Sequence, residues 1–154
     1  MLRLLSQALL SIVFILSALP VSADSTRVGD LVIDSPWARA SIGMSRPAAA
    51  YMTIRNEGTV SDALLAVSTP LSGMAEVHAT STKNGVMSMG PAGPVEIQGG
   101  GNVLLAPGGL HIMMKKLKKA LIKGKTVEIT LAFKRSGKVT VTAPIYGPGA
   151  TRPE

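Results

Sequence analysis

The chain has 154 residues, a formal net charge of +7 at pH 7, 46% hydrophobic residues and no cysteine. This length suits one domain with a hydrophobic core and is short for two domains of ordinary size. The lack of cysteine excludes disulfides and metal sites built from thiolates, while the positive charge favours acidic partners.

The first 23 residues have the pattern of a secretory signal peptide, in which Arg3 precedes an apolar run (8–19), then Pro20 and small residues. We expect cleavage after Ala23 and a periplasmic mature protein. A transmembrane anchor is the alternative, but the run is shorter than the roughly twenty residues that a span needs. Removing the leader leaves 15 Lys and Arg against 9 Asp and Glu. We assign 24–147 to one domain and 148–154 to a flexible tail.

Short apolar or alternating runs separated by Gly, Pro, Asn and Ser occupy the rest of the chain. Nine of them are predicted strands: 31–34, 48–56, 63–68, 74–81, 85–90, 102–106, 110–114, 126–133 and 138–144. Many short strands at this spacing predict an all-β protein, an antiparallel Greek-key β-sandwich or barrel. The one helix-like stretch (113–125) is interrupted by Gly124, so we expect a loop with at most one or two helical turns.

Both histidines of the chain lie near methionines. Asn84-Gly85 predicts a type I′ hairpin in which Thr80 faces Met89, so that His78 and Met89 become diagonal neighbours on one face. His111 and Met113, two residues apart, share a face of a later strand. If the two strands are neighbours, two imidazoles and two thioethers point towards one place.

These donor types favour monovalent copper. Thioether sulfur is a soft neutral ligand that suits Cu(I) and serves Zn, Mg or Ca poorly, whereas imidazole suits copper in either oxidation state. We therefore predict one Cu(I) per chain, with Cu(II) kept open. The alternative is that the methionines only fill a core, which is the commoner role of a strand methionine.

The spacing His78-x10-Met89-x21-His111-x-Met113 resembles the His/Met pattern of the PCuAC family of periplasmic copper-binding proteins. The segments "SPWARAS", "AAAYMTIRNEG" and "PGGLHIMMKKLKKAL" are also similar to that family, and the resemblance covers about residues 28–145. It implies a cupredoxin-like fold holding one exposed Cu(I). It further implies delivery to the CuA-bearing subunit of cytochrome c oxidase, beside thioredoxin-like copper-assembly proteins. Some members add a Met/His-rich tail for a second copper, which this sequence lacks.

Six lysines fall within eleven residues, from Lys115 to Lys125. One interpretation is a docking patch for an acidic protein surface, which would be steered to the metal by charge. The others are a solvated loop and, less favoured, a membrane-surface helix. Nucleic acid is not expected, since the few aromatic residues are not interleaved with the lysines.

The sequence therefore predicts a monomeric copper chaperone that is not an enzyme, because no nucleophile, base and orienting group occur together. A copper storage or resistance protein with the same site is the first alternative. The second is a β-sandwich interaction module with a methionine-rich core. A copper enzyme is the weakest, since thioether coordination stabilises Cu(I).

Overall fold

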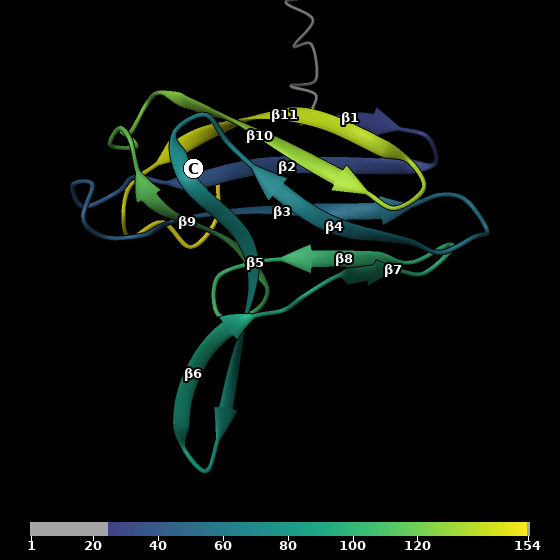
Figure 1. Cartoon of the computed structure of the whole chain (residues 1–154), viewed down its shortest axis with the longest axis horizontal. Coiled ribbons are helices and arrows are strands. Elements are labelled where there is room, and N and C mark those ends of the chain that lie inside the picture. The colour runs from purple at the N-terminus through teal and green to yellow at the C-terminus, as the bar shows by residue number, and fades with distance from the viewer. Residues whose placement is uncertain (1–24, 154) are drawn as a thin grey trace, which may run out of the picture.

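The computed structural model describes residues 25–153; the leader and its predicted cleavage after Ala23 lie outside the described residues. The described part contains eleven strands: β1 (Ser25–Val28), β2 (Leu31–Arg39), β3 (Ala48–Asn56), β4 (Asp62–Ser68), β5 (Ser72–Lys83), β6 (Val86–Pro91), β7 (Val95–Ile97), β8 (Asn102–Leu105), β9 (His111–Leu117), β10 (Thr126–Phe133) and β11 (Gly137–Tyr146) (Figure 1). Between residues 25 and 153 no helix is long and apolar enough to cross a membrane.

All nine predicted strands are present, and the predicted all-β class is confirmed. Two short strands, β1 and β7, carry too few residues for an alternating pattern to be recognised in the sequence. The helix-like stretch forms no helical turn: β9 extends through Leu117, and 118–125 consists of bends and a turn. The expected loop is therefore correct, and its first residues belong to a strand.

The strands form one sheet path in the order β6-β5-β9-β3-β2-β11-β10-β4-β7, with β1 on β2 and β8 on β3. Neighbours that are far apart in sequence, such as β5 and β9, require crossovers as in Greek-key folds. The pairs are antiparallel except β11 with β2, which run parallel, so the sheet is mixed. Contacts of β4 with β5 and of β7 with β3 show that the sheet folds back around a common interior.

Alternation of side chains produces the core. In β10, Val127, Ile129 and Leu131 are buried while Glu128 is exposed, because successive strand residues point to opposite faces. The same rule in β9 places Ile112 and Met114 in the core. Their neighbours in sequence, His111 and Met113, therefore lie on the opposite face of the sheet.

The hairpin of β5 and β6 extends away from the body of the sheet (Figure 1). Its turn has positive φ at Asn84 (52°) and Gly85 (76°), as a type I′ turn requires. Thr80 pairs with Met89 and Lys83 with Val86, which confirms the predicted register. The residues Val86, Met87 and Met89 of this hairpin are exposed.

The end of the chain contacts the sheet. Arg39 Nε donates a hydrogen bond to the Ala150 carbonyl at 2.6 Å. Trp37 is buried against Tyr51, with ring centroids 4.4 Å apart, and against Tyr146 at 6.1 Å. The Arg39 hydrogen bond attaches the end of the chain to β2, and the Trp37 contacts pack β2 against β3 and β11.

Candidate metal centre

Strand pairing brings the two histidines together. His78 on β5 lies directly opposite His111 on β9, although 32 residues separate them in sequence. The ring centroids are 6.1 Å apart with the planes inclined by 45°. Both residues are only 6% exposed, which is unusual for a polar side chain on the outer side of a sheet.

The hydrogen bonds of the two imidazoles differ. His111 Nδ1 lies 3.0 Å from the Gly109 carbonyl oxygen. Since a carbonyl only accepts, Nδ1 of the neutral ring carries the proton and Nε2 keeps its lone pair. Neither ring nitrogen of the buried His78 has a hydrogen-bond partner. A buried polar atom without a hydrogen-bond partner lowers the stability of the folded protein by about 1–3 kcal/mol. His78 therefore either destabilises the fold or binds a ligand such as a metal ion.

The two methionines lie beside this histidine pair on the same face. Met89 is opposite Thr80 and thus diagonal to His78, while Met113 is two residues from His111 on β9. Met89 is 57% exposed and Met113 is half-buried, and both line one groove of about 370 Å³. Met114, in contrast, is fully buried in the core. The four predicted residues therefore share one region, which opens to solvent on the methionine side.

The site contains a fifth residue, Glu76, which the sequence pattern did not predict. It lies opposite Met113 and two residues before His78, so its side chain is on the same face. Glu76 Oε1 is 3.2 Å from His78 Nε2, outside hydrogen-bond geometry, and forms an ion pair with Lys115 Nζ at 2.5 Å. The hydrogen bond from Lys115, followed by the interaction with His78, holds the pKa of Glu76 below its usual value. The spacing Glu76-x-His78 is the signal that could have revealed it.

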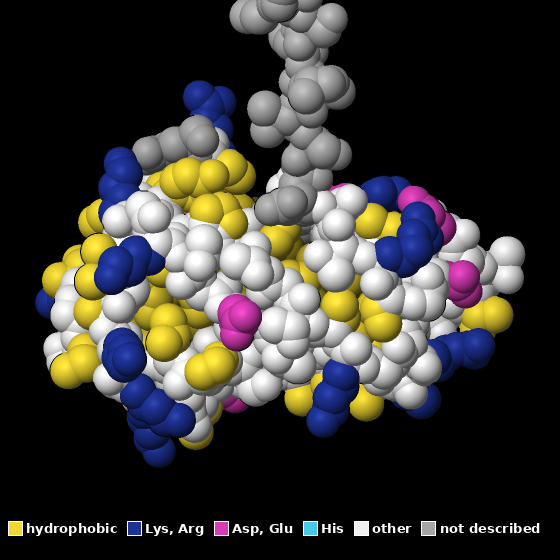
Figure 2. Space-filling view, turned by 90° about the horizontal axis from the view of Figure 1, so that it is seen from above, with side chains coloured by type: hydrophobic (Ala, Val, Ile, Leu, Met, Phe, Trp, Pro, Cys, Tyr) yellow, Lys and Arg dark blue, Asp and Glu magenta, His cyan; other side chains and the backbone are white. Residues whose placement is uncertain are grey.

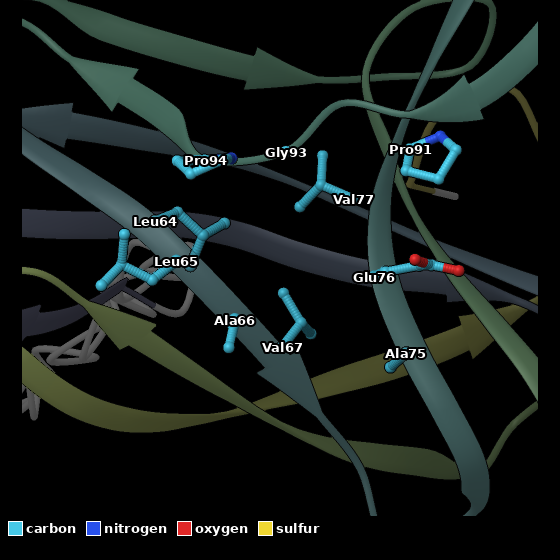
Figure 3. Close-up of a pocket in the computed structure, with 10 residues that line it drawn as sticks. All are labelled: Leu64, Leu65, Ala66, Val67, Ala75, Glu76, Val77, Pro91, Gly93 and Pro94. Carbon is cyan, nitrogen blue, oxygen red and sulfur yellow. The ribbon is translucent and has the colours of Figure 1, made fainter.

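Glu76 is also one of the residues that line a pocket of about 240 Å³ between β4 and β5, but the direction of its carboxylate differs from that of most other lining side chains. Figure 3 shows the carboxylate on the opposite side of β5 from the side chains of Leu64 and Val67. Val77, the next residue, lies on the same side of β5 as Leu64 and Val67 and lines that pocket. This pocket holds no group of metal-binding side chains.

The available donors restrict the metal that could bind. No group of three or more His, Asp or Glu side chains suited to a metal occurs in the described range 25–153. The side chains that share a face with the two histidines include the thioethers of Met89 and Met113. Imidazole with thioether is a set that suits Cu(I) better than Zn, Mg or Ca.

The lysine segment (115–125) begins at this site. Lys115 is half-buried against Glu76, and the later lysines 116, 118, 119, 123 and 125 are exposed. Leu121 is buried and anchors the segment to the core. Figure 2 shows Lys and Arg side chains around the edge of one face of the molecule, on which no histidine is visible.

Taken together, the fold and the cluster define a class: small cupredoxin-like β-proteins that carry a His/Met cluster on the outer side of a sheet. A family model described as "Putative lipoprotein LpqE-like" matches residues 31–145, and the chain belongs to this PCuAC-type family. A curated relative from Leifsonia xyli subsp. xyli, "Putative lipoprotein Lxx21020", is 30% identical over 131 residues, covering 82% of this chain and 77% of the relative.

Solved structures similar to this chain are PCuAC domains and a related copper protein. The apo PCuAC domain from PmoF1 is 31% identical with a TM-score of 0.69, and covers 81% of this chain and 100% of that domain. The copper-bound PCuAC domain from PmoF2 is 26% identical with a TM-score of 0.70, covering 81% and 99%. The Cu(I) form of DR1885 from Deinococcus radiodurans is 28% identical with a TM-score of 0.59, covering 82% and 83%.

Proposed function

We propose that the protein is a copper chaperone that binds one Cu(I) through His78, Met89, His111 and Met113 and passes it to a recipient protein. The observation that carries this proposal is the buried histidine pair: His78 faces His111 across β5 and β9, and the ring nitrogens of His78 make no hydrogen bond, although the Glu76 carboxylate lies 3.2 Å from Nε2. A metal ion bound there would satisfy the lone pair of His78 and offset the cost of its burial.

The chemistry of the donors supports the monovalent ion. His111 is fixed by Gly109 in the tautomer that leaves Nε2 free, as is common for metal-bound histidines. Two neutral imidazoles and two neutral thioethers add no negative charge, which suits Cu(I). The copper-bound forms among the similar structures support a copper site in this chain as well.

A carrier must release its metal, and the placement of the methionines suits that task. Met89 is on an exposed hairpin and Met113 is half-buried, so an incoming ligand could replace a thioether while the buried histidines still hold the ion. The lysine segment next to the site would attract an acidic acceptor surface. By family resemblance, the acceptor is the CuA-bearing subunit of cytochrome c oxidase, with thioredoxin-like proteins as helpers.

We place this function in the periplasm. The predicted signal peptide and the lipoprotein descriptions of the family and of the Leifsonia relative support an exported or envelope protein. Thioether ligands suit an oxidising compartment, because methionine cannot be lost to disulfide formation.

The proposal is tested by titrating the purified protein, residues 24–154, with Cu(I) in reducing buffer and with Zn(II). We expect one Cu(I) per chain that is not displaced by equimolar zinc, and a nitrogen-and-sulfur shell in X-ray absorption. Two or more coppers per chain, or displacement by zinc, would contradict the four-residue site. A variant with Phe in place of both His78 and His111 serves as the metal-free control.

A further inference from the structure

The groove that contains Met89 and Met113 has a second wall, formed by the loop of residues 40–47. Its lining includes Ile42, Arg46, Ala49 and Pro148 as well as the two methionines, and neither histidine. Ile42 is 63% exposed. Of the four proposed ligands, only the two thioethers thus line this opening.

The charged side chains that line the groove are all positive. Arg39 and Arg46 line it, and no carboxylate does. Arg39 lies over the Tyr51 ring, 5.4 Å from the centroid, which orients its side chain. An occupant with a carboxylate at its edge would therefore meet two guanidinium groups, which bind carboxylates in a fixed planar geometry.

The groove is also joined to the lysine segment. Ser41 N donates to the Leu121 carbonyl at 2.9 Å, and Leu121 N donates to Ser41 Oγ at 3.0 Å. These two hydrogen bonds hold the base of the 40–47 loop against the segment that carries the lysines. The lysine segment therefore adjoins the loop that forms one wall of the groove.

We propose that this groove is the port through which the acceptor takes the copper, and that its occupant is an apolar loop of the acceptor flanked by carboxylates. This inference rests on the proposed function and adds the route of exchange. The incoming donor atom forms a bond to Cu(I) as the bond to Met89 or Met113 breaks. The copper stays monovalent and no electron is exchanged. The volume of about 370 Å³ is at the lower end of ligand-binding pockets and suits a few side chains.

The test uses two aromatic Cu(I) chelators as acceptors: bicinchoninate, which carries two carboxylates, and neocuproine, which is neutral. Transfer from the copper-loaded protein is followed by stopped-flow absorbance. We expect a rate that rises with chelator concentration, because exchange requires entry of the new ligand. A rate independent of concentration for both chelators would overturn the port, since copper would then leave before the acceptor binds.

Two variants separate the contributions of shape and charge. Ile42→Ser should slow transfer to both chelators, whereas Arg46→Gln should slow transfer to bicinchoninate about threefold or more and leave neocuproine unaffected. Ile122→Ser is the matched control, because Ile122 is 52% exposed on the lysine segment and does not line the groove. Equal rates for all variants would overturn the inference.

Cu(I) affinity of each variant is measured first by equilibrium competition. We expect unchanged affinity, since neither Ile42 nor Arg46 is a proposed ligand. If wild-type protein bound no Cu(I), the proposed function itself would fail. If affinity were intact but the rates were equal, only the port would be wrong.

Discussion

Glu76 Oε1 lies 3.2 Å from His78 Nε2 and forms an ion pair with Lys115 on the neighbouring strand. The carboxylate therefore joins a proposed ligand to the first residue of the lysine segment. A carboxylate next to a metal-binding histidine orients its ring and raises its basicity. The structure thus adds a residue to the site that contributes through His78.

Replacing Glu76 by Gln should lower Cu(I) affinity by about 10–100-fold, the usual effect of losing such a partner. The amide keeps the size of the side chain but loses the charge that interacts with His78 and Lys115. Competition titration measures the change. Glu96→Gln, an exposed position on β7, is the matched control and should bind as the wild type does. Unchanged Cu(I) affinity in Glu76→Gln would show that Glu76 only forms the ion pair with Lys115 and does not contribute to copper binding.

Met89→Leu and Met113→Leu should each lower Cu(I) affinity strongly and cost less than about 1.5 kcal/mol of stability, since the swaps conserve volume. The control is Met114→Leu, which also removes a thioether sulfur, but from the buried core next to the site. This variant should leave copper binding unchanged. Affinity and urea denaturation are measured on all three. Wild-type affinity in both ligand variants would support the core-filling interpretation of these methionines.

Replacing Lys116, Lys118, Lys119 and Lys125 by Gln, with Lys115 kept because it pairs with Glu76, should slow copper transfer to a soluble CuA-domain acceptor and leave Cu(I) affinity nearly unchanged. Exposed charges raise encounter rates and act over a Debye length of about 8 Å at physiological salt, so the wild-type rate should also fall with salt. Stopped-flow transfer at low and high salt measures both effects.

The control for this variant is Lys134→Gln with Lys138→Gln, which removes exposed charges from the β10–β11 hairpin. Similar slowing in the control would indicate an effect of net charge and not a docking patch. Equal rates for wild type and the four-Gln variant would leave the segment as a solvated loop.

Asp62 on β4 should make the stability depend on pH. Burial raises its pKa, but hydrogen bonds from Ser136, Arg135 and Ala63 outweigh that effect, and the net pKa lies below the usual value. Its stabilisation is therefore complete above the unfolded-state pKa of about 3.9, and is lost as pH falls through the lower folded-state pKa.

Asp62→Asn should be about 1–3 kcal/mol less stable than the wild type at neutral pH, because three part-buried N–H groups lose a charged acceptor. The difference should shrink in strong acid. Urea denaturation between neutral and strongly acidic pH measures it, with Glu128→Gln, an exposed carboxylate on β10, as control. A constant difference at every pH would rule out this role for Asp62.

The sequence by itself determined what depends on near neighbours in the chain. Alternation at Val127, Ile129 and Leu131 predicted a strand with one buried face, because side chains two apart always share a face. Asn84-Gly85 determined the register of the β5–β6 hairpin, because a two-residue turn with positive φ fixes which residues oppose each other. The diagonal relation of His78 and Met89 follows from that turn.

Only the tertiary structure decided which strands became neighbours. The pairing of β5 with β9 brings His78 opposite His111 and Glu76 opposite Met113, and no local pattern predicts it. The burial of both histidines and the approach of the 40–47 loop to Met89 and Met113 are likewise products of the whole fold. The physical reason is that a turn or an alternating strand is set by a few adjacent residues, whereas the order of strands is chosen by the burial of the entire core.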